Sequence, residues 1–169
     1  MVSNLKVAGI VRESIVDGPG IRLVVFAQGC KHNCPGCHNP ETHSFDGGTV
    51  ISIEAILKML SENPLLDGIT LSGGEPFEQA EGFAELAYRS KLLGFNVMTY
   101  TGYTCEKIIK DCGQRPGWDR LLEQTDILVD GRFEEDKRNL LLKFRGSENQ
   151  RLIDVKRTKR ENKVVIVDL

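Results

Sequence analysis

Three cysteines lie within eight residues of one another, directly after the continuous apolar run 23–27. Cys30, Cys34 and Cys37 have the spacing C-x3-C-x2-C, inside a segment, 29–40, that is rich in Gly, Pro and Asn. Those residues supply tight turns, and the backbone amides of such a loop can hydrogen-bond to sulfur. The sequence therefore predicts a metal-binding loop at the end of a buried strand, which is where α/β folds place their sites.

Two kinds of metal centre fit this loop. An ordinary electron-transfer [4Fe-4S] cluster uses four cysteines, so three cysteines leave one iron open to a substrate or cofactor. A structural zinc site is the competing interpretation, because Cys3His is a common zinc ligand set and His32, His38 or His43 could supply the fourth ligand. The spacing favours iron and sulfur over zinc.

The remaining cysteines, Cys105 and Cys112, are expected in the core. With Ile108 and Ile109 they recur at i, i+3, i+4 and i+7 of a predicted helix, so both thiols should face inward with those isoleucines. The lone Trp118 has the same helical spacing with its apolar neighbours and is also expected in the core.

Length and charge limit the functions open to the chain. Its 169 residues suit a single domain, 1–169, and its net charge of -2 lacks the basic balance of a nucleic-acid-binding protein. Charged residues interrupt the first 25 residues, and no apolar stretch is long enough to cross a membrane. We therefore expect a cytoplasmic protein with reduced thiols, bound to neither nucleic acid nor membrane.

Apolar runs and helical periodicity alternate along the chain, which predicts an α/β fold. Four or five strand-helix units are too few for a complete eight-fold barrel, so the expected architecture is a partial, open (β/α) barrel of mostly parallel strands. The tail, about 151–169, is expected to form a terminal hairpin or edge, with strands at 152–156 and 163–167 joined by a basic turn. The other expected strands are 6–11, 23–27, 69–71, 95–100 and 127–129, and the expected helices are one that begins after Ser52, 78–93, 104–111 and 118–124.

The segment Ser72-Gly73-Gly74-Glu75-Pro76 joins a predicted strand to a predicted helix. Its glycines allow a ligand to approach the backbone closely, and Pro76 suits a first helical turn. Glu75 disfavours a phosphate and favours an ammonium group, such as the amine of an amino-acid ligand.

Taken together, the cysteine loop and the Gly-Gly-Glu-Pro segment resemble those of the radical S-adenosylmethionine superfamily. Within it, the chain is similar to activating enzymes of glycyl-radical enzymes, above all those of anaerobic ribonucleoside-triphosphate reductase. The resemblance runs from about residue 15 to 151. Its further motifs are Asp-Gly-Pro-Gly-Ile-Arg at 17–22, Thr-Gly-Tyr at 101–103, Leu-Val-Asp-Gly-Arg-Phe at 128–133 and Phe-Arg-Gly-Ser-Glu-Asn-Gln at 144–150.

The resemblance implies a ligand set for two cofactors. Cys30, Cys34 and Cys37 would hold a [4Fe-4S] cluster whose open iron chelates the methionyl amine and carboxylate of S-adenosylmethionine. Further cofactor contacts would come from Gly73, Gly74 and Glu75 at the methionyl amine, from the backbone of Gly36, Cys37 and His38 at the adenine, and from Asp130 and Arg132 at the rear of the pocket. Many relatives have an aromatic residue before the third cysteine, where this chain has Gly36.

The resemblance also implies an activity. An external reductant such as flavodoxin or ferredoxin would reduce the cluster, and cleavage of S-adenosylmethionine would yield a radical that takes hydrogen from a glycine of the partner reductase. One alternative is an activase for another glycyl-radical enzyme, such as pyruvate formate-lyase. The other is a non-catalytic Cys3His zinc or electron-transfer module. Sequence alone leaves open whether Arg145 contacts the cofactor, the partner or its own fold.

Overall fold

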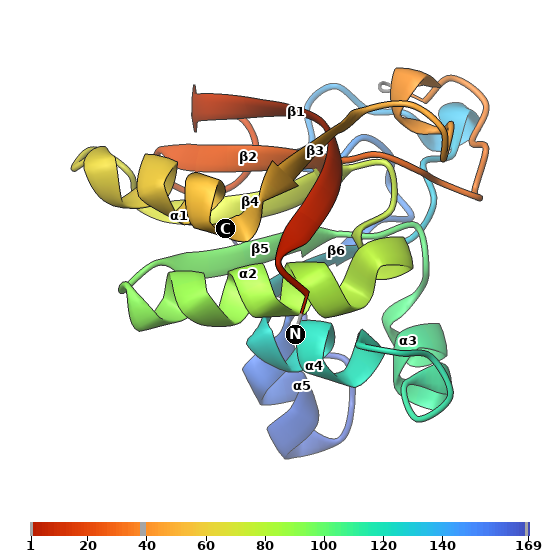
Figure 1. The fold of residues 1–169 in the computed structure, drawn as a ribbon. Coiled ribbons are helices and arrows are strands. Elements are labelled where there is room, and N and C mark those ends of the chain that lie inside the picture. The colour runs from red at the N-terminus through yellow and green to blue at the C-terminus, as the bar shows by residue number, and fades with distance from the viewer. Residues whose placement is uncertain (1, 38–39, 168) are drawn as a thin grey trace.

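The computed structural model describes residues 2–37, 40–167 and 169 and arranges them around one seven-stranded sheet (Figure 1). The order across the sheet is β3-β1-β2-β4-β5-β6-β7. Its strands are β1 (Asn4–Ser14), β2 (Arg22–Ala27), β3 (Thr49–Ser52), β4 (Gly68–Gly73), β5 (Asn96–Tyr100), β6 (Ile127–Asp130) and β7 (Arg151–Asp154).

The sheet is parallel at its centre and antiparallel at its edges. β2, β4, β5 and β6 pair in parallel, whereas β1 pairs antiparallel with both β2 and β3, and β7 pairs antiparallel with β6. The expected α/β class and open sheet are confirmed. A mostly parallel sheet is not, because three of the six pairings are antiparallel.

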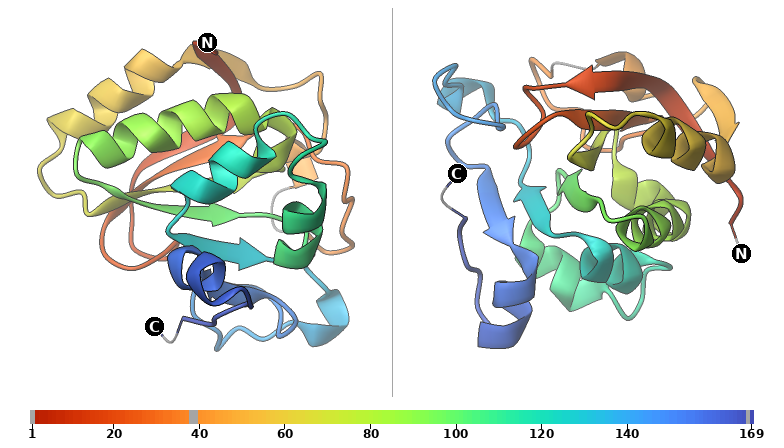
Figure 2. Two further views of the ribbon diagram at one scale, coloured as in Figure 1. Left: turned by 90° about the horizontal axis from the view of Figure 1, so that it is seen from below. Right: turned by 90° about the vertical axis from the view of Figure 1, so that its left-hand side faces the viewer.

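Helices cover one face of this sheet, as two views of the ribbon show (Figure 2). The α-helices are α1 (Ile53–Glu62), α2 (Ala80–Leu92), α3 (Cys105–Asp111), α4 (Trp118–Gln124) and α5 (Val155–Glu161), and short 3-10 turns are η1 (Pro40–Thr42), η2 (Pro76–Gln79) and η3 (Glu135–Lys137). Helix α1 begins as predicted, because the Ser52 side chain accepts a hydrogen bond from the Ala55 amide. The expected helix 78–93 divides into η2 and α2.

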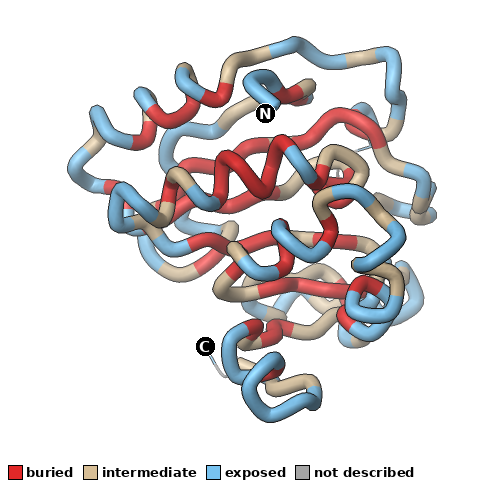
Figure 3. Tube along the Cα trace, turned by 60° about the horizontal axis from the view of Figure 1, so that its bottom comes forward, coloured by how far each residue is buried: buried red, intermediate tan, exposed pale blue. Residues whose placement is uncertain are grey.

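The core lies between the sheet and the helix layer (Figure 3). Leu23, Val24 and Val25 of β2 are completely buried, which confirms a strand covered on both faces. Trp118 is 1% exposed, as predicted, and its indole nitrogen donates a hydrogen bond to the Phe77 carbonyl. Among the described residues, no helix is long and apolar enough to span a membrane.

The helix α3 is buried along a narrower stripe than its periodicity predicts. Cys105 and Ile108 are buried, and Cys112 is partly buried against the core. Ile109 is 46% exposed, so its expected place in the core is wrong. The reason is that α3 lies beside α4, beyond the main helix layer, and only the side that faces α4 is covered.

The tail is not a plain hairpin, because its expected basic turn is the helix α5. The Asp154 side chain caps this helix by accepting the Arg157 amide, and Val155 and Thr158 are buried beneath it. The chain then returns beside β7 through a bridge between Ile166 and Ile153. Since β7 runs antiparallel to the central strands, α5 lies at the opposite end of the sheet from the cysteine loop.

Candidate functional site

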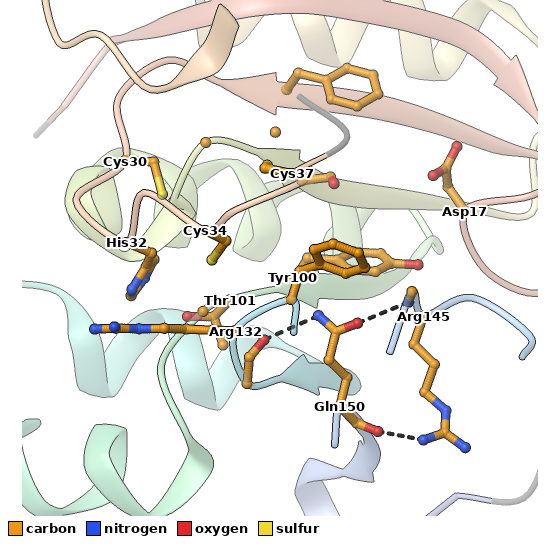
Figure 4. A pocket seen from close by; sticks show the side chains of 18 of the residues that line it. Asp17, Cys30, His32, Cys34, Cys37, Tyr100, Thr101, Arg132, Arg145 and Gln150 are labelled. Carbon is orange, nitrogen blue, oxygen red and sulfur yellow. Dashed lines mark hydrogen bonds between the residues drawn. The ribbon is translucent and has the colours of Figure 1, made fainter. Parts of the chain in front are cut away.

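A cavity of about 460 Å³ lies where the parallel strands end, beside the cysteine loop (Figure 4). All three clustered cysteines line it, together with Gly73 and Gly74 at the end of β4. Arg132, which follows β6, lines it as well. Residues predicted from three separate motifs therefore meet in one place.

The cysteine loop follows β2 and is anchored by its backbone. The Gly29 amide donates to the Thr42 carbonyl at 2.6 Å, and the Cys30 amide donates to the His43 carbonyl at 3.1 Å. All three thiols are partly buried and none is in a disulfide. Burial raises the pKa of Cys30 to about 11 and also raises the pKa of Cys34, so these thiols keep their protons at neutral pH until a metal displaces them.

The arrangement of the thiols around one cavity is compatible with an iron-sulfur cluster. Across the described residues, no group of three or more His, Cys, Asp or Glu side chains is placed to hold one metal ion. The His32 ring is directed at Glu75, with 2.6 Å between Nε2 and Oε1, rather than at the thiols. His38 lies outside the described residues. In a [4Fe-4S] cluster each cysteine binds a different iron, so three thiols facing one cavity need not converge on a point.

The Gly-Gly-Glu segment is tied to the cysteine loop by its backbone. The Gly74 amide donates to the Ala27 carbonyl and the Glu75 amide to the Gly29 carbonyl, both at 2.8 Å. Gly73 has a φ of +89°, and a Cβ there would lie 2.5 Å from the Ala27 nitrogen. Only glycine fits this position, and its backbone faces the cavity.

Glu75 lies behind this backbone and is completely buried. Its carboxylate accepts hydrogen bonds from the Gly102 amide at 2.8 Å, the Phe77 amide at 3.0 Å and the Thr101 hydroxyl, besides its contact with His32. A carboxylate with this many internal donors is held as a fixed negative charge beneath the Gly73–Gly74 wall.

The position before the third cysteine has a structural reason to be glycine. Gly36 has a φ of +73°, and a Cβ there would lie 2.8 Å from the carboxyl carbon of Glu135. The end of the Glu135 side chain therefore lies next to Gly36, and the positive φ disfavours any residue but glycine there.

Asp130 and Arg132 lie differently, although only Gly131 separates them in sequence. Asp130 is 1% exposed and accepts the Cys105 amide at 2.8 Å and the Arg151 guanidinium at 2.5 Å. These bonds join the end of β6 to the start of α3 and to β7. Arg132, in contrast, is at the cavity wall beside Cys34.

Two parts of the cavity wall escaped sequence reasoning. Tyr100 ends β5 in the cavity, and its hydroxyl donates to the Phe144 carbonyl. Gln150 holds the loop 144–150 by accepting the Gly146 amide at 2.8 Å. Arg145 lines the cavity but donates to the carbonyls of Glu148 and Gln150, so it supports its own loop. The only sequence signal for this loop was the Phe-Arg-Gly-Ser motif at 144–147. A motif does not show whether the arginine side chain points at a ligand or at its own loop.

The cysteine loop and its cavity define a protein built for one iron-sulfur cluster, and a family model described as a 4Fe-4S single cluster domain matches residues 16–153. Three relatives carry the name anaerobic ribonucleoside-triphosphate reductase-activating protein. That of Pasteurella multocida is 35% identical over 80% of this chain and 89% of its own, that of Escherichia coli K12 is 32% identical over 80% and 90%, and that of Enterobacteria phage T4 is 30% identical over 81% and 86%. A solved structure, QueE from Escherichia coli, matches 60% of this chain and 54% of its own at 16% identity and a TM-score of 0.48.

The chain therefore belongs to the family of anaerobic ribonucleoside-triphosphate reductase-activating proteins.

Proposed function

We propose that this protein binds a [4Fe-4S] cluster and S-adenosylmethionine in the cavity at the strand ends, and uses them to place a glycyl radical on anaerobic ribonucleoside-triphosphate reductase. One observation carries the proposal: Cys30, Cys34 and Cys37 line the same cavity as the Gly73–Gly74 backbone. The names of its relatives support the choice of partner.

The residues of this chain bind, orient and shield. The three cysteines would hold three irons of the cluster and leave the fourth open to the amine and carboxylate of the ligand. When bound, the reduced cluster and S-adenosylmethionine together supply reductive bond cleavage and hydrogen abstraction from a glycine. The cavity walls would enclose that chemistry on the protein's side. No acid-base side chain is required of the protein.

The methionyl amine would rest on the Gly73–Gly74 backbone, over the charge of Glu75. Because Glu75 is buried, its negative charge is poorly screened by water and favours an ammonium group on the cavity side of the wall. The backbone of Gly36, Cys37 and His38 would contact the adenine, and Arg132 would close the rear. Asp130 would contribute indirectly, through Arg151 and the start of α3.

The electron would come from a reductant such as flavodoxin or ferredoxin, in the cytoplasm. Docking at the basic helix α5 would place the donor at the far end of the sheet from the cysteines. We therefore place donor docking near the cysteine loop, on the side where Cys34 and Pro35 border a second hollow.

The test mixes the anaerobically reconstituted protein, S-adenosylmethionine and a chemical reductant with anaerobic ribonucleotide reductase or with pyruvate formate-lyase. Electron paramagnetic resonance should show a glycyl radical on the reductase and none on the lyase. A radical on the lyase alone would reassign the partner. A colourless protein that holds one zinc and no iron or sulfide would refute the proposal.

A further inference from the structure

Two of the three residues between Cys30 and Cys34 contact the segment that follows β4. Lys31 forms an ion pair with Glu78, with 3.5 Å between nitrogen and oxygen; the lysine side chain is 65% exposed and that of Glu78 is 10% exposed. The contact of His32 with Glu75 is different, because it is 2.6 Å long and the two side chains are 4% and 0% exposed. A buried contact of this kind is far stronger than an exposed ion pair.

The His32 ring is packed closely against Tyr103 and Gly102. The Tyr103 ring packs edge-on against it, with 4.6 Å between ring centroids, and Tyr103 packs in turn on Trp118 at 4.8 Å. In addition, a Cβ on Gly102 would lie 2.4 Å from the His32 ring. The core therefore fixes the orientation of a side chain that belongs to the cysteine loop.

Glu75 connects this histidine to both strand-end segments of the cavity. The oxygen that contacts His32 also accepts the Gly102 amide at 2.8 Å, and the Thr101 hydroxyl bonds to the same carboxylate. Gly74, Thr101 and Gly102 all line the cavity. One carboxylate thus joins the cysteine loop, the end of β4 and the end of β5.

We propose that His32 is a positioning residue that couples the cysteine loop to the ligand-binding loop through Glu75. Its hydrogen bond sets the position of the segment between Cys30 and Cys34 relative to the Gly73–Gly74 backbone. This contact would fix the position of a cluster on the cysteines relative to a ligand amine on that backbone. The inference rests on the proposed function, since it concerns how that site binds S-adenosylmethionine.

Three variants test the coupling in the full-length protein: His32→Ala, His32→Gln and, as a control in the same spacer, Lys31→Ala. Iron and sulfide content, the dissociation constant for S-adenosylmethionine and the paramagnetic resonance spectrum of the reduced cluster are measured for each. All three variants keep the three cysteines, so each should load a cluster. His32→Ala should weaken binding about tenfold, the size of one charge-assisted hydrogen bond, and should lose the spectral change that the ligand causes in wild type.

Glutamine can donate to Glu75 from nearly the same place as Nε2, so His32→Gln should restore most of the affinity and of the spectral change. Lys31→Ala should match wild type, because the lysine side chain is 65% exposed and Glu78 keeps its contacts with Tyr103 and Arg115.

Wild-type affinity and spectrum in His32→Ala would overturn the coupling. So would a glutamine variant as impaired as the alanine variant, or loss of the cluster from both, because the histidine would then serve loop folding alone. A wild-type protein that loads a cluster but shows no spectral response to S-adenosylmethionine would instead refute the proposed function.

Discussion

Removal of the Asp130 carboxylate should cost stability rather than ligand affinity. In Asp130→Ala the buried Cys105 amide loses its acceptor, which costs about 1–3 kcal/mol. Arg151 loses a charge-assisted hydrogen bond, which typically costs about 1.5–3 kcal/mol. The cost should lie at the lower end of this range, because the Arg151 side chain is 31% exposed and keeps its contact with Glu106 at 2.6 Å. The expected loss is about 3 kcal/mol of unfolding free energy, a large part of the stability of a single domain.

Urea denaturation of the metal-free protein measures this loss. Asp130→Asn should lose about half as much, because the amide oxygen can still accept the Cys105 amide. Glu106→Gln is the matched control, since it removes the exposed partner of the same arginine and should cost under about 1 kcal/mol. If Asp130→Ala unfolds like wild type while its affinity for S-adenosylmethionine falls tenfold or more, the carboxylate touches the ligand and the structural role is wrong.

Three further sets of substitutions probe the cluster, a helix cap and the residue before the third cysteine. Cys34→Ala should lose the cluster while Cys112→Ala keeps it, as iron and sulfide analysis will show; equal loss in both would make Cys112 a ligand. Ser52→Ala should lower the unfolding free energy by about 1 kcal/mol in urea denaturation, because the Ala55 amide loses its cap, and no change would mean that water replaces it. Gly36→Phe should release iron faster than wild type during exposure to a chelator. Adding Glu135→Ala should restore only part of the iron retention, since the positive φ at position 36 persists. Full iron retention in Gly36→Phe alone would refute the steric reason.

Local signals in the sequence were enough for the centre of the fold. The continuous apolarity of 23–27 needs cover on both faces, and the structure provides it. Ser52 before an amphipathic run marks the start of α1, because the cap and the periodicity act within one turn of helix. The cysteine loop and the Gly-Gly segment meet because both follow neighbouring parallel strands, β2 and β4.

The edges of the sheet depend on contacts that no local pattern records. β3 is only four residues long, and half of it is exposed, so it has no buried periodicity of its own and forms because β1 is there to pair with it. The helix α5 has almost no apolar stripe, since most of its residues are charged. It forms because Asp154 caps it and because Val155 and Thr158 are buried. Both contacts depend on the position of the end of β7 in the fold.

Two acidic residues of the cofactor motifs lie inside the fold, and their role toward the ligand stays a prediction. Glu75 and Asp130 were both expected at the cofactor, yet each is buried and engaged by internal donors. A carboxylate taken out of water must be paired, so an acidic residue inside a folded domain first serves the scaffold that pairs it. The surface that faces the cavity includes the thiols and glycine backbone, together with aromatic and basic side chains such as Tyr100 and Arg132. Side-chain substitutions behind that surface should therefore alter ligand binding by displacing loops, and the His32 variants separate that effect from loss of the cluster.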